Sequence, residues 1–208
     1  SRSRETFGRL VMFRKQQLAL TLETPSCILR LPMMSDHLQW AEQRQKSKQF
    51  LENWEPVWSP DYFSKRAFQN RVYWANKSFK NLSSLPLFII RRNDNQLVGA
   101  ITLDNIRRGP SQSGTLGYWI GQDFARLGYM SEAVKAVVAY SFSKIDLSRI
   151  EAATLPNNSA SRGLLEKSGF KYEGVAQSYL QISGRWRSHV LYANLRNDRR
   201  GKTEAGID

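Results

Sequence analysis

Residues 115–133, TLGYWIGQDFARLGYMSEA, join a predicted strand, a short loop and the start of a helix. The strand ends at Ile120, a loop with the sequence ARLGY follows, and the helix begins at about Met130. Backbone amides at a helix N-terminus lack partners and carry partial positive charge, and Gly128 lets the chain approach a ligand without a Cβ in the way. The stretch therefore predicts a pyrophosphate cradle, although many such turns only connect two elements. It is neither a Walker loop nor a GxGxxG fingerprint, which argues against a nucleoside triphosphate or a dinucleotide.

Upstream of this stretch, the pattern predicts two helices and three strands. Ser35 is the expected N-cap of a polar helix over residues 35–51, and Ser59 with Pro60 is the expected start of the second helix. The second helix has an apolar face at spacings of four, three and four, formed by Phe68, Val72, Ala75 and Phe79. Trp74, on the same helix, is expected in the core. The strands cover residues 26–31, 87–91 and 97–103, and the turn sequences cover residues 92–95 and 108–111.

Downstream, a helix from about Met130 is expected to face the core with Val134, Val137, Val138 and Ser141. A strand over residues 149–155 precedes a helix over residues 158–168, which Gly169 ends in the C′ position. Strands over residues 170–179 and 186–195 complete the pattern. The order predicts an α+β fold with one domain, whose mixed, mostly antiparallel sheet has about six to seven strands flanked by helices.

The composition sets the domain limits and the class of protein. The chain has 208 residues and a net charge of +13, from 31 Lys and Arg against 18 Asp and Glu. Residues 1–24 are expected to form a basic extension, residues 25–197 the domain, and residues 198–208 a solvated tail. Such a charge favours an anionic partner, although a basic protein can owe its charge to solubility alone.

The cysteine and histidine content is low. A single cysteine excludes an intramolecular disulfide and, with only two histidines, leaves too few ligands for a closed zinc site, so no metal is expected. No apolar run approaches the ~18 residues of a membrane span. We expect a cytoplasmic protein with no membrane contact.

Four segments, in order, resemble one known family. LGYWIG at residues 116–121 with RLGYMSEA at residues 126–133 is similar to the acetyl-CoA loop of the GNAT superfamily of N-acetyltransferases. PNNSAS at residues 156–161 with LLEKSGF at residues 164–170 resembles the second CoA-contacting segment of that family. FLENWEP at residues 50–56 and YLQISGRWR at residues 179–187 resemble the ribosomal-protein-alanine N-acetyltransferase branch, the RimJ/RimL type and within it RimJ.

The resemblance implies which residues bind the acetyl donor. Those residues are Ile120, Arg126, Leu127, Gly128, Tyr129, Met130, Ser131, Asn158 and Ser161. Two positions depart from the family pattern, since Ala125 replaces Gln or Arg and Met130 places bulk where Gly or Ala brings the backbone near the cofactor. Leu165 stands where some relatives protonate the thiolate with a Tyr, which leaves Ser161 as the candidate acid. The alternative for Asn158 and Ser161 is capping of the helix.

The acceptor side of the site is expected at Trp54, Glu55 and Tyr179. Glu55 and, as an alternative, Glu151 are candidate general bases, and a salt-bridged carboxylate or a water relay competes with both. Cys27 lies in an apolar strand and is expected to be a core thiol and not a nucleophile. His189 is expected to be a satisfied sheet residue.

The resemblance implies direct transfer of acetyl from acetyl-CoA to the N-terminal α-amine of a protein that begins with Ala or Ser, with a ribosomal protein as the expected partner. Such an amine, with a pKa of about 7.7–8.0, needs little help from a base, whereas a lysine side chain near 10.4 needs far more. Two alternatives remain: acetylation of a small-molecule amine or antibiotic on the same fold, and a non-catalytic module that binds RNA or the ribosome. The basic surface suits contact with rRNA, and we expect a monomer or a weak homodimer.

Overall fold

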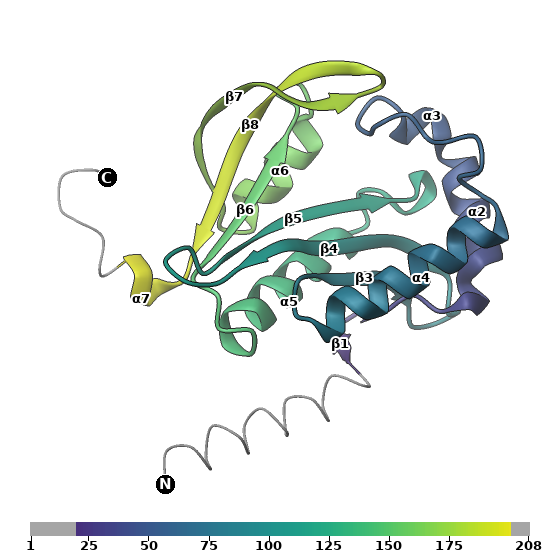
Figure 1. Cartoon of the computed structure of the whole chain (residues 1–208), viewed down its shortest axis with the longest axis horizontal. Coiled ribbons are helices and arrows are strands. Elements are labelled where there is room, and N and C mark those ends of the chain that lie inside the picture. The colour runs from purple at the N-terminus through teal and green to yellow at the C-terminus, as the bar shows by residue number, and fades with distance from the viewer. Residues whose placement is uncertain (1–19, 201–208) are drawn as a thin grey trace, which may run out of the picture.

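One eight-stranded sheet runs through the computed structural model, which describes residues 20–200 (Figure 1). The strands occur in the order β1-β2-β3-β4-β5-β6-β8-β7. Their bounds are β1 Thr21–Glu23, β2 Cys27–Arg30, β3 Leu85–Arg91, β4 Leu97–Arg107, β5 Ser113–Ile120, β6 Arg149–Thr154, β7 Lys171–Ile182 and β8 Arg185–Leu195. The helices are η1 Met34–Asp36, α2 His37–Lys46, α3 Lys48–Leu51, α4 Lys65–Lys80, η2 Gln122–Phe124, α5 Tyr129–Ser143, α6 Ser159–Lys167 and α7 Asn197–Arg200.

The only parallel pair in this sheet is β5 with β6. Their pairing starts at Ser113 with Arg149 and stops at Leu116 with Ala152, although β5 continues to Ile120 and β6 to Thr154. Beyond that point the two strands diverge. β5 stays bound to β4, and β6 stays bound to β8, so the sheet opens along its middle.

Helices cover both faces of the sheet, with α2 and α4 on one side and α5 and α6 on the other (Figure 1). Successive side chains of a strand point to opposite faces. Phe88 of β3 accordingly packs with Trp40 and Phe68, whereas its neighbour Ile89 packs in the core cluster that contains Val134 of α5. The predicted α+β fold is confirmed, with eight strands in place of six to seven.

The first two helices begin and end differently from the expectation. The segment 35–51 is divided into η1, α2 and α3, and Ser35 lies inside η1 and not at an N-cap. The second helix, α4, starts after Ser64 and not at Ser59, because the Ser64 hydroxyl accepts the Ala67 N–H at 3.1 Å. The rings of Trp58 and Tyr62 stack at 5.0 Å instead of joining the helix.

The apolar face of α4 is confirmed for Phe68, Ala75 and Phe79, which are buried. The expected place of Trp74 in the core is wrong, since this residue is 58% exposed to solvent. The helix turns 100° per residue, so residue 74 lies well away from the buried positions.

Both ends of the described region add contacts that the sequence did not indicate. Strand β1 lies within the segment 1–24 that was expected to be an extension, and it pairs with β2. Near the other end, Arg196 donates to the Phe142 carbonyl at 3.1 Å and Arg199 donates to the Ser111 carbonyl at 2.9 Å. The expected solvated tail therefore begins with a short helix that is bound to the domain. Residues 1–19 and 201–208 lie outside the described residues.

Between residues 20 and 200, no helix has both the length and the apolar character that a membrane crossing requires.

Candidate active site

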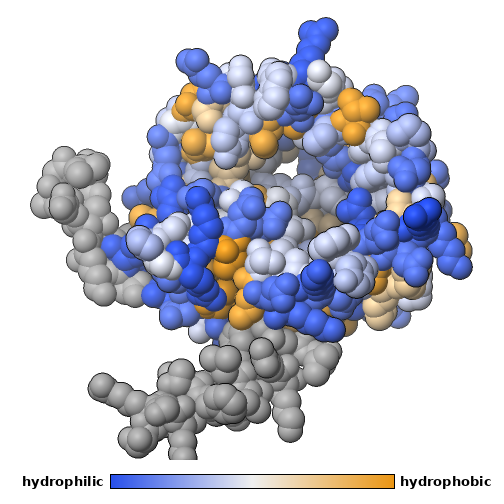
Figure 2. Space-filling view, viewed as in Figure 1, coloured by the Kyte–Doolittle hydropathy of each residue, from blue (hydrophilic) through white to orange (hydrophobic). Residues whose placement is uncertain are grey.

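A cleft of about 1380 Å³ occupies the region where β5 and β6 diverge. Figure 2, which has the same view as Figure 1, shows this face of the molecule hollowed between its upper and lower halves. The lining comes from the end of β5, the loop before α5, the first turn of α6, the α3–α4 connection and the β7–β8 hairpin. Segments far apart in the sequence thus meet at one opening of the sheet.

The loop that was predicted to form the cradle ends on the N-terminus of α5. Gly128 is the N-cap of this helix with φ of +87°, and Arg126 also has a positive φ of 63°. The first intrahelical contact is the Glu132 N–H to the Gly128 carbonyl at 3.1 Å. The amides of residues 129–131 therefore have no partner within the helix, and the helix dipole adds partial positive charge there.

The structure adds a backbone reason for Gly128 to the expected approach of a ligand. A Cβ at this position would meet no atom within 4 Å, so close packing does not require glycine. The positive φ does, because side chains with a Cβ rarely adopt it.

The cleft brings together eight of the nine residues expected to bind the donor: Ile120, Arg126, Gly128, Tyr129, Met130, Ser131, Asn158 and Ser161. Leu127 is not among the lining residues and is 58% exposed. The Met130 side chain is buried in the core cluster with Ala133 and Val134, so most of its bulk is accommodated by the core.

The backbone of β5 offers a hydrogen-bond donor to the cleft. The Gly121 N–H donates to the Val98 carbonyl of β4 at 2.8 Å. Since N–H groups of successive strand residues point to opposite sides, the Ile120 N–H points away from β4, toward the divergence from β6.

Ser161 makes two different contacts at the first turn of α6. Its backbone N–H donates to Asn158 Oδ1 at 3.1 Å, so Asn158 caps the helix. Its hydroxyl lies 2.7 Å from the Tyr118 phenol oxygen. Burial raises the pKa of Tyr118 to about 12, against the opposing effect of the Ser161 hydrogen bond. Sequence reasoning assigned no role to Tyr118, although its place two residues before the end of β5 puts it at the cleft.

Glu55 lies on the cleft wall as an ion-paired carboxylate. Arg44 donates to both carboxylate oxygens, and the Trp58 indole N–H donates to Oε2 at 3.0 Å. The Arg44 guanidinium lies 4.7 Å from the Trp58 ring centroid and 4.7 Å from that of Trp119. These contacts favour the salt-bridged alternative for Glu55 over a general base, because three hydrogen bonds already hold its two oxygens.

Near Glu55, the wall of the cleft that was expected to receive the acceptor also carries aromatic side chains. Trp54 and Tyr179 both line the cleft, and the Tyr179 ring contacts the His189 ring edge-on at 5.7 Å. His189 Nδ1 donates to the Arg187 carbonyl at 2.9 Å. The Ser183 N–H donates to the Glu55 carbonyl at 2.8 Å and ties this wall to the β7–β8 hairpin.

Two alternatives from the sequence lie outside the cleft. Glu151 forms ion pairs with Arg107 and Arg149 and is not a lining residue. Cys27 is fully buried, and burial together with the charge of Glu132 raises the pKa of its thiol to about 11. In the part of the chain that the structure describes, no group of three or more His, Cys, Asp or Glu residues could hold a metal ion.

Residues 27–171 match the family described as acetyltransferase (GNAT) domain. The chain belongs to this family. It is 32% identical over 181 residues to the ribosomal protein uS5-alanine N-acetyltransferase of Escherichia coli (strain K12). The aligned region covers 87% of this chain and 93% of that protein. It is 31% identical over 153 residues to the probable N-acetyltransferase YjcK of Bacillus subtilis (strain 168), with 74% of this chain and 84% of that protein covered.

Solved structures agree with this assignment. The ribosomal-protein-S5-alanine acetyltransferase of Vibrio fischeri superposes with a TM-score of 0.81 at 28% identity, over 86% of this chain and 98% of that one. Mycobacterium smegmatis RimJ, in complex with CoA-disulfide, superposes with a TM-score of 0.79 at 28% identity, over 86% of this chain and 87% of that one. The GNAT acetyltransferase and its RimJ/RimL likeness, both expected from the sequence, are confirmed, and the protein is an acyltransferase.

Proposed function

We propose that this protein transfers an acetyl group from acetyl-CoA to the N-terminal α-amine of a ribosomal protein that begins with Ala or Ser, in the cytoplasm. The observation that carries the proposal is the single cleft, which joins the α5 N-terminus to the aromatic acceptor wall of Trp54 and Tyr179. The Escherichia coli and Vibrio fischeri relatives, which are named for acetylation of such a protein on alanine, support it. The CoA-disulfide bound to Mycobacterium smegmatis RimJ supports the donor.

The donor is held by backbone groups. The amides of residues 126–131 and the dipole of α5 suit a pyrophosphate, which is an anion that needs several donors at once. Asn158 uses Oδ1 to cap α6, which leaves its Nδ2 to donate to the pantetheine arm. These residues place the thioester between the end of β5 and the start of α6.

The amine nitrogen then attacks the thioester carbon, and the carbon–sulfur bond breaks. The Ile120 N–H donates to the oxygen on which negative charge develops. The Ser161 hydroxyl donates a hydrogen bond to the departing sulfur, and the Tyr118 phenol, protonated at a pKa of about 12, donates to Ser161. A thiolate is a stable leaving group, so hydrogen bonding suffices without full proton transfer.

The acceptor amine loses its proton to water in the cleft. Near pH 7.5, roughly a third of an α-amine is already neutral, whereas about 0.1% of a lysine side chain is. Because the Arg44 ion pair occupies Glu55, the cleft favours the amine that needs the weaker base. Glu55 anchors the acceptor wall against which the first residue of the substrate packs.

Two peptides of one sequence test the proposal. Each begins with Ala-Arg and contains one internal lysine, and one of them has a blocked N-terminus. We expect labelled acetyl-CoA to modify the free peptide at its N-terminus and to leave the blocked peptide unmodified. Comparable labelling of the lysine in the blocked peptide would refute the α-amine assignment. Incubation with the ribosomal proteins of the source organism then identifies the acceptor by its labelled N-terminus.

A further inference from the structure

Helix α4 carries positive charge and no negative charge on its surface. Its charged residues are Lys65, Arg66, Arg71, Lys77 and Lys80, and all five are exposed. No acidic residue stands between Asp61 and Asp94 in the sequence. Residues three and four apart on a helix surface are neighbours, so acidic partners on the helix itself are absent for these charges. The helix is therefore a concentrated source of positive potential within a basic protein.

An exposed aromatic pair lies among these charges. Tyr73 and Trp74 are each 58% exposed, and their rings meet edge-on at 5.4 Å. The Lys77 ammonium lies 4.8 Å from the Trp74 ring centroid. The folding of α4 does not use these two rings, because the opposite side of the helix already buries Phe68 and Phe79.

The exposed residues form one stripe. Spacings of four, three, four and three place five residues along one face of the helix: Arg66, Asn70, Tyr73, Lys77 and Lys80. Trp74 lies beside them. The stripe is about 21 Å long at 1.5 Å per residue. Arg71 is not part of it, since its guanidinium lies 4.9 Å from the Trp40 ring centroid, toward the core.

We propose that the charged and aromatic residues of this stripe, Arg66, Tyr73, Trp74, Lys77 and Lys80, form a docking surface for RNA with unpaired bases. The cations contact phosphates, and the exposed ring faces stack on bases, which is the combination that single-stranded nucleic acid requires. A lysine-rich helix without aromatics would suit any polyanion, and an aromatic pair without lysines would suit an apolar partner. The charge and the rings together favour RNA.

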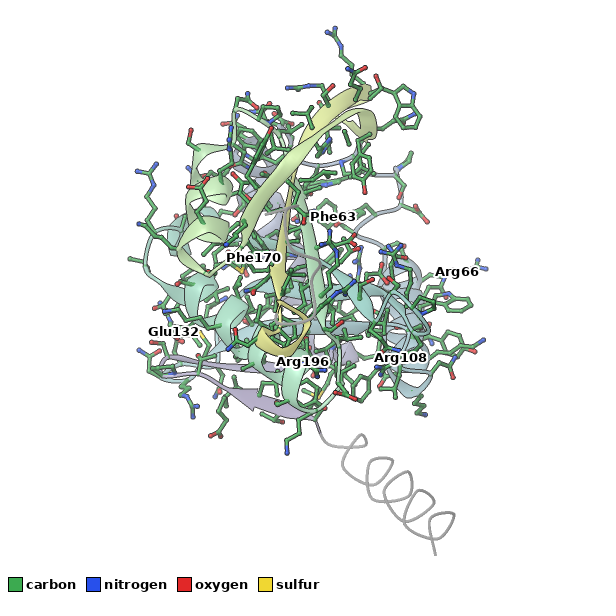
Figure 3. The ribbon with its side chains drawn as sticks, turned by 90° about the vertical axis from the view of Figure 1, so that its left-hand side faces the viewer. Phe63, Arg66, Arg108, Glu132, Phe170 and Arg196 are labelled. Carbon is green, nitrogen blue, oxygen red and sulfur yellow. The ribbon has the colours of Figure 1, made fainter. Side chains whose placement is uncertain are left out.

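The stripe is separate from the cleft. It lies on the α4 side of the sheet, whereas the donor loop leads into α5 on the other side (Figure 1). In Figure 3, Arg66 of α4 and Glu132 of α5 lie on opposite sides of the molecule. None of the five stripe residues lines the cleft. The surface therefore serves binding and not catalysis, and the inference does not rest on the proposed function.

Fluorescence anisotropy with a labelled 20-nucleotide single-stranded RNA tests the surface, with the duplex of the same sequence as the second probe. We expect the full chain to bind the single strand more tightly than the duplex. Tyr73→Ala/Trp74→Ala should weaken single-strand binding by at least about fivefold, since the stacking of bases on these rings is removed. Lys77→Glu/Lys80→Glu should weaken binding and also flatten its salt dependence, by a slope of about 0.7 for each phosphate that the variant no longer neutralises.

Matched controls separate this surface from net charge. Lys144→Glu/Lys171→Glu changes the charge by the same amount at exposed lysines outside α4, and Tyr172→Ala removes another exposed ring. Both should leave the affinity within twofold of the parent, and peptide acetylation should be unchanged in all variants. Equal losses in the controls, equal affinity for duplex RNA, or unchanged binding by the Tyr73→Ala/Trp74→Ala variant would overturn the proposal. A dimer that this variant converts to a monomer, with RNA affinity unchanged, would make the stripe a contact between copies instead.

Discussion

The Tyr118 phenol and the Ser161 hydroxyl lie 2.7 Å apart, which links β5 to the first turn of α6 at the point where the sheet opens. Burial raises the pKa of Tyr118 to about 12, so the phenol is protonated throughout the physiological range. Either hydroxyl can donate in this contact, and where the phenol donates to Ser161 Oγ, the serine hydrogen is left for a group in the cleft. The pair is in place beside the cleft before any substrate binds.

Removal of the phenol should therefore affect the rate and not the affinity. We expect Tyr118→Phe to lower kcat for peptide acetylation about tenfold, with KM for acetyl-CoA within twofold, because a neutral hydrogen bond contributes ~0.5–1.5 kcal/mol. Ser161→Ala should lower kcat at least as much. The double variant should be no slower than Ser161→Ala alone, since Tyr118 acts through Ser161.

The pH profile provides a second readout for this pair. Because the pKa of Tyr118 is about 12, Tyr118→Phe should leave the shape of the kcat profile between pH 6 and 10 unchanged. Strictly additive losses in the double variant, or a loss of activity confined to KM, would show that the hydrogen bond has no part in transfer.

Gly128 should be required for donor binding through its backbone conformation. Gly128→Val places a branched side chain at φ of +87°, which strains or shifts the start of α5 and its amides. We expect the Kd for CoA, measured by calorimetry, to rise at least tenfold, or about 1.4 kcal/mol. Gly109→Val is the matched control, since Gly109 also has a positive φ, of 62°, and open space for a Cβ, but lies in the β4–β5 turn. Similar Kd values for the two variants would refute the placement of the pyrophosphate on this loop.

The donor loop was accessible to sequence reasoning, whereas the contacts across the cleft were not. A strand, a glycine and a helix start are local signals, and the structure has all three between Ser113 and Ser143. Ser47, which lies between α2 and α3, makes a contact far away in the chain, since its hydroxyl accepts the Gln122 N–H at 2.9 Å. No periodicity in the sequence indicates such a contact.

Arg44 and Trp74 show the same limit in opposite directions. The polar helix that contains Arg44 indicates an exposed side chain, yet the guanidinium is buried between two tryptophan rings that come from distant segments. Trp74 is the kind of residue expected in a core, yet it is exposed beside Lys77. Burial of a charge or exposure of a ring depends on the tertiary neighbours, which the helical pattern does not contain.

Cys27 should make the stability of the protein decrease in alkaline solution. Its thiol has a pKa of about 11 when folded, raised from 9.0 by burial and by Glu132, so the unfolded chain loses this proton first as the pH rises. The unfolded state then binds fewer protons than the folded state, and the free energy of unfolding falls between pH 9 and 11. Urea midpoints of the parent and of Cys27→Ala, compared at pH 8 and pH 10.5, should show a steeper fall for the parent. Parallel slopes for the two proteins would contradict this pKa, and native Cys27 should also resist thiol reagents at pH 8.

Variants of the Arg44–Glu55 ion pair should show whether Glu55 is a structural anchor or a general base. The Arg44 side chain is 4% exposed and that of Glu55 is 19% exposed, so either substitution alone leaves a charge with little access to water. We expect Glu55→Gln and Arg44→Gln each to lower the free energy of unfolding by ~3 kcal/mol, and the double variant to lose less than the sum, because it leaves no unpaired charge. Denaturant unfolding measures the stability of all four proteins.

For activity, Glu55→Gln should keep the acid limb of the kcat/KM profile, which then reports only the α-amine near 7.7–8.0. If Glu55 were the general base, Glu55→Gln would lower kcat by about 10² or more and would abolish the acid limb of the profile. The comparison is made at temperatures where the variant is fully folded. Such a loss, in a variant whose unfolding free energy equals that of the parent, would assign the proton to Glu55 and refute the anchor.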